Sequence, residues 1–139
     1  MRILVTGGAG FIGGHLAESF TRDGHAVTVL DTLDPYYSVG IKRHNVDAAK
    51  QAAAESDGSY EFVQGSVTDA ELVTELVSAV DVVYHQAAQA GVRTSVENPE
   101  KPNRINVDGT LTVLEAARDA DIERVVNASS SSLYGKPEY

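Results

Sequence analysis

The stretch VTGGAGFIGGHL, at residues 5–16, constrains the fold of this chain more than any other segment. It places Gly7, Gly10 and Gly13 at GxxGxxG spacing, between an apolar run and a helical pattern. In such a turn one glycine lets the chain bend sharply, another lets the backbone approach a pyrophosphate, and a third lets helix and strand pack closely. The helix N-terminus then offers free N–H groups to an anion. The alternative is a tight turn that binds no ligand.

The next apolar run, AVTVLD, ends at Asp31 and supports the anion-binding interpretation. A carboxylate at this point accepts hydrogen bonds from both adenosine ribose hydroxyls and repels a 2′-phosphate, which predicts NAD rather than NADP. The alternative is that Asp31 only caps a turn. Arg43 is the nearest basic residue that would complicate the preference for NAD.

Apolar runs and helical patterns alternate along the whole chain. We expect strands at 2–5, 26–31, 60–65, 79–85 and 124–129, and helices at 11–22, 39–55 and 103–120. A further helix is expected after Thr68 and Glu71, which have capping-box spacing, and residues 91–103 are expected to form a loop. This order predicts one domain over residues 1–139 with an α/β fold of Rossmann type, a doubly wound parallel sheet of five strands with helices on both faces.

The composition excludes several classes of function. A net charge of −9, from 20 acidic and 11 basic residues, argues against nonspecific binding of nucleic acid, which needs a basic face. Cysteine is absent and the four histidines are scattered, so we expect no metal site. The N-terminus lacks a signal peptide and no apolar run is long enough for a membrane span, so we expect a cytoplasmic protein with no membrane partner. We interpret the acidic excess as that of an ordinary acidic enzyme rather than as adaptation to high salt.

Five segments carry a resemblance to a known family: TGGAGFIGGHL, VLDTLDPYY, YHQAAQAGVRTSVENP, NVDGTLTVLEAA and SSSSLYG. With these in order, the chain resembles the extended short-chain dehydrogenases/reductases over its whole length. Within them it is most similar to NAD-dependent nucleotide-sugar epimerases and dehydratases, such as the UDP-glucose and UDP-glucuronate 4-epimerases. The resemblance implies NAD as cofactor and C4 epimerisation of a UDP-hexose or UDP-hexuronate through a transient 4-keto sugar. It specifies the superfamily more narrowly than the substrate.

The resemblance also implies which residues hold the cofactor. The backbone at residues 11–12 would contact the pyrophosphate, residues 31–32 the ribose, and residues 66–67 the adenine, although Ser66 replaces an Asp that is usual in the family. Residues 86–89 would line the nicotinamide half, and Asn106 would lie near the cofactor unless it only begins a helix. The expected cofactor-binding residues are Gly7, Gly10, Phe11, Ile12, Gly13, Asp31, Thr32, Ser66, Val67, Gln86, Ala87, Ala88, Gln89 and Asn106.

For the substrate, the resemblance points to the serine cluster and to one arginine. Ser130 matches a family Ser or Thr that hydrogen-bonds the reacting sugar oxygen, four residues before Tyr134. Ser131 and Ser132 stand where the 4,6-dehydratases carry an Asp-Glu pair, which favours the epimerase branch. Arg93 lies in a segment close to the sugar in glucuronate-type relatives, where a guanidinium pairs with a carboxylate or phosphate. Its alternative role is that of a surface arginine.

The catalytic base of this family is missing from the sequence. It is a tyrosine whose phenolate is stabilised by a lysine four residues later, and no lysine of this chain follows a tyrosine at that spacing. The resemblance places that pair beyond the serines, together with further strands and a sugar-nucleotide lobe. We therefore interpret the 139 residues as the N-terminal part of a longer protein, inactive alone, whose parent binds a nucleotide sugar.

Two other interpretations of the missing base remain open. The chain could be a non-catalytic NAD-binding module, or a fragment of a nucleotide-sugar dehydratase or reductase. Truncation would turn the fifth strand into an exposed sheet edge, and such edges recruit other chains. We therefore expect a homo-oligomer formed through that strand, or through swapped elements.

Overall fold

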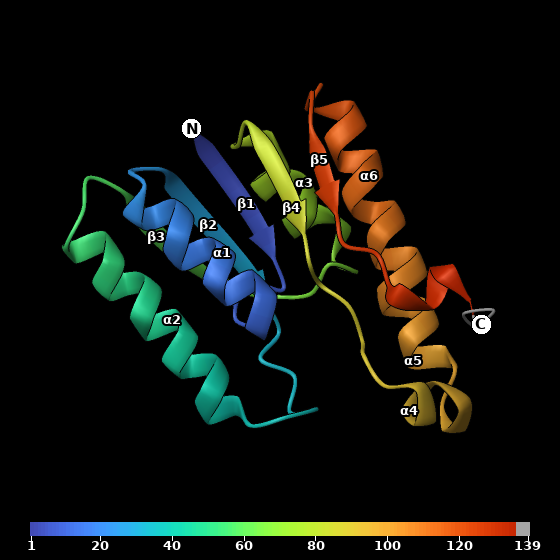
Figure 1. Cartoon of the computed structure of the whole chain (residues 1–139). Coiled ribbons are helices and arrows are strands. Elements are labelled where there is room, and N and C mark those ends of the chain that lie inside the picture. The colour runs from blue at the N-terminus through green and yellow to red at the C-terminus, as the bar shows by residue number, and fades with distance from the viewer. Residues whose placement is uncertain (136–139) are drawn as a thin grey trace.

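A computed structural model describes residues 1–135 of the chain as a parallel sheet with helices on both faces (Figure 1). Its strand order is β3-β2-β1-β4-β5. Successive strands are added on one side of β1 up to β3 and then on its other side from β4, so the strand order reverses between β1 and β4. This is the Rossmann-type sheet that the alternating sequence pattern predicts. The strands are β1 (Arg2–Thr6), β2 (Ala26–Asp31), β3 (Ser59–Gln64), β4 (Val82–His85) and β5 (Val125–Asn127).

Each face of the sheet has its own apolar core. On one face, Ile3 and Val5 of β1 pack with Ala17 of α1 (Phe11–Arg22), and α2 (Val39–Ala54) lies beside α1. On the other face, Leu4 packs with residues of α3 (Ala70–Ser78) and α6 (Gly109–Asp119). Successive strand residues point to opposite faces, so one continuous apolar strand supplies both cores. No helix within residues 1–135 is both long and apolar enough to cross a bilayer.

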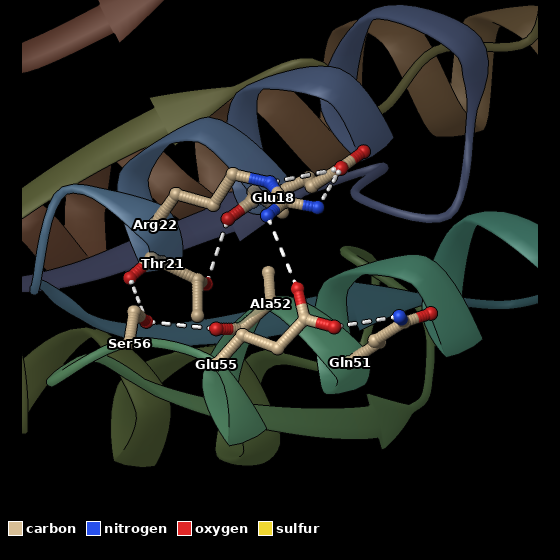
Figure 2. A network of polar contacts seen from close by, with 8 residues as sticks. Glu18, Thr21, Arg22, Gln51, Ala52, Glu55 and Ser56 are labelled. Carbon is tan, nitrogen blue, oxygen red and sulfur yellow. Dashed lines mark hydrogen bonds and ion pairs between the residues drawn. The ribbon is translucent and has the colours of Figure 1, made fainter.

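A polar network joins the C-terminal ends of α1 and α2 (Figure 2). The Ser56 hydroxyl lies 2.9 Å from the Thr21 carbonyl oxygen and 2.8 Å from that of Ala52. Arg22 donates to Glu18 at 2.9 Å and reaches Glu55 at 3.5 Å. Because both helices run antiparallel to the strands, this network lies at the edge of the sheet where the strands begin, away from the glycine turn.

The segment after β4 differs from the sequence expectation. Residues 91–103 were expected to form a loop, but they contain α4 (Val92–Glu97) and α5 (Glu100–Asn103). Pro99 precedes α5 and Pro102 lies in its first turn, where a backbone N–H has no intrahelical partner to lose. The helix expected at 103–120 is also divided, because a π-helical turn at Arg104–Asp108 precedes α6.

The start of α3 is also corrected by one residue. Asp69, and not Thr68, is the N-cap, because its side chain accepts a hydrogen bond from the backbone N–H of Leu72 at 3.2 Å. The Thr68 hydroxyl instead lies 2.8 Å from the Ser66 hydroxyl. The capping-box spacing therefore identifies the helix correctly but assigns its cap to the wrong side chain.

Candidate functional site

A cleft of about 470 Å³ opens where the strands end, at the point where the strand order reverses. In open α/β sheets this reversal leaves a crevice in which ligands bind. The structure brings together every expected cofactor residue except Asn106 in the lining of this cleft. The glycine turn, the end of β2, the start of the segment after β3 and the segment after β4 each contribute.

The glycine turn forms one wall of the cleft. Gly7 has a φ of +67°, and a Cβ there would lie 2.7 Å from the backbone nitrogen of Ala87. A Cβ on Gly13 would overlap the Gly7 carbonyl oxygen, so α1 approaches the turn closely only because both residues are glycines. No side chain caps α1 and no acidic residue occupies its first turn. Its positive dipole end therefore faces the cleft, where it favours an anion.

Asp31 ends β2 beside this wall and is buried. Its Oδ2 accepts the N–H of Ala9 at 3.1 Å, and its Oδ1 accepts the N–H of Leu33 at 2.7 Å. Leu33 has a φ of +56°, a left-handed conformation that the Asp31 contact helps to hold. A carboxylate has about four acceptor positions. The two that remain are consistent with the expected role at a ribose, although the structure adds a cation that the sequence analysis missed.

That cation is Lys42, not Arg43. The Lys42 ammonium lies 3.8 Å from Asp31 Oδ1 and 4.8 Å from the centre of the Tyr37 ring, and it is buried, whereas Arg43 is exposed. The sequence held a usable signal: Lys42, Val46 and Ala49 share the buried face of α2 at helical spacing. Burial raises the pKa of the Tyr37 hydroxyl, and the nearby Asp31 charge adds to this effect.

The loop after β2 also touches the segment after β4. Lys101 of α5 donates to Asp34 at 2.7 Å, and this hydrogen bond is the main cause of the lowered pKa of Asp34. Tyr36 lies so close to Gly91 that a Cβ there would come within 2.5 Å of the Tyr36 hydroxyl. Asp34 and Tyr37 themselves line the cleft. These contacts tie together two segments that flank the cleft, and no local sequence signal identifies them.

Asn106 lies outside the lining but contacts it. Its Oδ1 accepts the N–H of Gln89 at 2.7 Å, and its Nδ2 donates to the Gln89 carbonyl at 3.1 Å. The side chain of Asn106 therefore fixes the backbone of a residue that lines the cleft. It acts through Gln89 in this structure, and it does not itself face the cleft.

The serine cluster lies at the other end of the cleft. Ser129 lines both the main cleft and a smaller pocket of about 370 Å³, which Ser130, Leu133 and Tyr134 complete. Ser131 is exposed in a 3₁₀ turn at Ser131–Tyr134. Ser132 belongs to the same turn, and its side chain falls outside the described part of the chain.

Arg93 is separated from these groups. It is exposed on α4 and is absent from the described lining of either pocket. Its predicted contact with a sugar therefore stays a prediction.

Comparison with known proteins identifies the family. The sequence model of the NAD dependent epimerase/dehydratase family matches residues 3–139. The chain belongs to this family. It is 40% identical over 139 residues to UDP-glucose 4-epimerase of Mycolicibacterium smegmatis, covering 99% of this chain and 41% of that protein. It is also 40% identical over 140 residues to dTDP-glucose 4,6-dehydratase of Mycobacterium tuberculosis, covering 99% of this chain and 39% of that protein.

Solved structures of the epimerase/dehydratase family show the same fold. The UDP-glucose 4-epimerase of Stenotrophomonas maltophila, with bound NAD and formylated UDP-arabinopyranose, matches with a TM-score of 0.85 at 30% identity. That match covers 100% of this chain and 40% of the other. The chain therefore spans about two fifths of the length of these relatives. Family membership establishes an NAD-dependent epimerase/dehydratase fold, while the activity of the whole protein needs a separate argument.

Proposed function

We propose that this chain is the cofactor-binding part of an NAD-dependent nucleotide-sugar epimerase acting at C4 of a UDP-hexose or UDP-hexuronate. The observation that carries the proposal is the cleft itself. It joins an uncapped helix N-terminus, the Asp31 carboxylate and Ser129 of the serine cluster in one continuous lining. NAD carries a matching group for each of these: an adenosine ribose diol for Asp31, a central anionic diphosphate for the helix N-terminus, and a reactive nicotinamide ring on the side of the serine cluster.

The residues present fit NAD. The backbone N–H groups at the start of α1 would hold the diphosphate. Gly7 and Gly13 let the turn pack this closely, because Cβ atoms at these positions would collide with neighbouring backbone atoms. Asp31 would accept the adenosine ribose hydroxyls, and Gln86–Gln89 would lie beside the nicotinamide. When bound, NAD supplies a reversible acceptor of hydride from the sugar carbon. Ser130 would hydrogen-bond the reacting sugar oxygen and hold it in place.

The serine cluster favours epimerisation over elimination. A 4,6-dehydration needs an acid and a base at the sugar, which dehydratases take from an Asp-Glu pair following the serine. The corresponding residues here are Ser131 and Ser132, which carry no charge and supply neither group. A dehydratase or reductase parent is the alternative within the family, and the 40% identity to a dTDP-glucose 4,6-dehydratase keeps it in view.

We further propose that the 139 residues alone bind NAD but do not turn over a sugar nucleotide. The sequence lacks a lysine four residues after any tyrosine, so it has no phenolate stabilised at neutral pH. A non-catalytic NAD-binding module is the second candidate, and the same missing pair favours it. The DNA downstream of codon 139 separates the two: a reading frame that continues into a tyrosine followed four residues later by a lysine supports the catalytic parent, whereas a frame without that pair supports the module.

NAD binding is tested by thermal denaturation in rising NAD concentration. Bound ligand stabilises the folded chain by about 2.7 kcal/mol at 100 times the dissociation constant. We expect NAD to raise Tm more than NADP, and Asp31→Ala to abolish most of the rise. Asp57→Ala, at an exposed residue, is the matched control and should respond as the unaltered chain does. No rise with millimolar NAD would count against the proposal.

We also propose that the chain self-associates through β5. Among the described residues β5 pairs only with β4, and Val126 of β5 is exposed. An unpaired strand edge of this kind is a template for another strand. Light scattering over a range of concentrations tests this, since a constant monomer mass would contradict it.

A further inference from the structure

His85 lies at the centre of a buried chain of hydrogen bonds beneath the cleft. It is the last residue of β4 and is 3% exposed. Its Nδ1 lies 2.7 Å from the hydroxyl of Thr6 on β1, and its Nε2 lies 3.0 Å from the hydroxyl of Thr110 on α6. The imidazole therefore bridges the strand that enters the glycine turn and the helix that follows the π-helical turn.

The partners of the two threonines determine the tautomer of His85. Thr110 donates its hydroxyl proton to the Asn106 carbonyl at 2.7 Å. A hydroxyl has one proton, so the Thr110 oxygen must accept from His85 Nε2–H. In neutral imidazole Nδ1 is then an acceptor, and the Thr6 hydroxyl donates to it. The Thr6 oxygen in turn accepts the N–H of Ala87 at 3.3 Å. Every donor in this series of hydrogen bonds has an acceptor only when His85 is neutral with its proton on Nε2.

The same series of hydrogen bonds fixes the backbone that lines the nicotinamide half of the cleft. On one side, Thr6 accepts the N–H of Ala87 through its hydroxyl and the N–H of Gln86 through its carbonyl at 3.1 Å. On the other side, Asn106 makes two hydrogen bonds to the backbone of Gln89. Both ends of the 86–89 segment are thus attached to groups that His85 links.

A proton added to Nδ1 would conflict with this arrangement. An Nδ1–H would point at the Thr6 oxygen, whose own proton points back toward Nδ1. Thr6 is fully buried, so its hydroxyl would have to turn away from the imidazole and lose its acceptor. The contact between Thr6 and Ala87 depends on the orientation of that hydroxyl. Protonation of His85 would therefore disturb the segment that the neutral imidazole stabilises.

We propose that His85 is a positioning residue that holds the 86–89 segment in its binding geometry as the neutral Nε2–H tautomer, and that proton uptake at Nδ1 loosens this segment and weakens dinucleotide binding. The identity of the ligand rests on the proposed function, whereas the tautomer and its link to the segment do not.

The surroundings of His85 favour its neutral form. Burial lowers the pKa of His85, and no charge contributes to that shift. The groups that face the imidazole from β1 and α6 are hydroxyls, and Asn127 of β5 pairs with His85 in the sheet. The charged residues of β1 and of the 104–119 segment are all exposed: Arg2, Arg104, Asp108, Glu115, Arg118 and Asp119. Because the folded state binds the proton less readily than the unfolded state, stability and ordering are present above pH 6.5 and are lost as pH falls through the folded pKa.

The test begins with NMR on the ¹⁵N-labelled chain and needs no ligand. At pH 7.5 the imidazole nitrogen signals of His85 should report the Nε2–H tautomer. On acidification, the amide signals of Ala87 and Gln89 should shift with a midpoint below pH 6.5. His85→Gln offers one acceptor and one donor but does not titrate, so these amide shifts should disappear in that variant. His25→Gln, at the opposite edge of the sheet, is the matched control and should titrate like the unaltered chain.

The second arm measures NAD affinity across the same pH range. In the unaltered chain the dissociation constant should rise by up to about tenfold per pH unit below the midpoint, as expected when only one protonation state binds. His85→Gln should give a flat profile and should recover most of the affinity that His85→Phe loses at pH 7.5. An Nδ1–H tautomer, or amide shifts that persist in His85→Gln, would overturn the inference. Absence of NAD binding with the predicted NMR behaviour would count against the proposed function and not against the role of His85.

Discussion

The contact between Gly7 and Ala87 offers a sharp test of how the cleft is built, because the chain contains a matched glycine elsewhere. Gly7 and Gly24 both have a positive φ, +67° and +83°. A Cβ on Gly7 would lie 2.7 Å from the Ala87 nitrogen and 2.8 Å from its Cα, whereas a Cβ on Gly24 would meet nothing within 4 Å. Alanine at Gly24 therefore reports the conformational cost alone, and alanine at Gly7 adds the steric cost.

The two costs can be estimated separately. A left-handed conformation costs a non-glycine residue about 1–2 kcal/mol, and the stiffer unfolded chain returns about 0.4–1 kcal/mol, so Gly24→Ala should destabilise by about 1 kcal/mol. Forcing a methyl group against packed backbone adds about 1–3 kcal/mol, so Gly7→Ala should lose about 2–4 kcal/mol. At a few degrees per kcal/mol, roughly 3–5 °C for a chain of this size, thermal melts resolve the difference.

Urea denaturation and NAD titration of both variants form the assay. We expect Gly24→Ala to bind NAD as the unaltered chain does. Gly7→Ala should bind at least about tenfold more weakly, because a displacement of Ala87 that costs about 1.4 kcal/mol in the bound state has that effect. Equal destabilisation by the two substitutions would show that the Ala87 backbone yields without cost. Unchanged NAD binding in Gly7→Ala would refute the claim that this contact shapes the cleft.

Three further sets of substitutions test other parts of the structure. The Tyr60 hydroxyl is buried without a hydrogen-bond partner among residues 1–135, so Tyr60→Phe should raise the free energy of unfolding by up to about 1 kcal/mol in urea denaturation. Asp69→Ala should cost about 1 kcal/mol as the loss of a helix cap, and Thr68→Ala less; the reverse order would restore Thr68 as the cap. Lys42→Met leaves the buried Asp31 without its cation and should destabilise by about 3 kcal/mol, while the double variant with Asp31→Asn should recover part of this loss. A purely additive double-mutant cycle would show that the two charges are not coupled.

Features encoded in local sequence were predicted well. The strands follow from β-branched apolar runs, although β4 begins three residues after its predicted start, because Ala79 caps α3, and β5 is shorter than predicted. Helix α1 begins and ends at the predicted residues Phe11 and Arg22, and the glycine turn has the conformation that its spacing implies. Each depends on residues within one or two helical turns of one another. The position of Asp31 beside the turn then follows from the parallel pairing of β1 and β2.

The missed features depend on contacts between distant segments. Lys42 and Arg43 are adjacent in sequence, and although helical spacing places Lys42 on the buried face of α2, its contact with Asp31 follows only from how α2 packs. The hydrogen bonds of His85 join residues from β1, β4 and α6, and no spacing rule connects these residues in the sequence. Asn106, whose place near the cofactor stays a prediction, lies one helical turn before Thr110 and binds the backbone of Gln89 through its side chain, a contact that the sequence does not show. Backbone hydrogen bonds of this kind have no sequence signature.

Because α1 runs antiparallel to the strands, its two ends lie at opposite edges of the sheet and have different roles. Its first turn faces the cleft and is built from glycine and exposed apolar side chains, while its last turn holds the Arg22 network beside α2. Substitutions in that network can therefore adjust heat resistance while coenzyme affinity is left alone. For an engineer, the far rim of the sheet is the place to stabilise this scaffold, and the glycine-lined rim is the place to leave untouched.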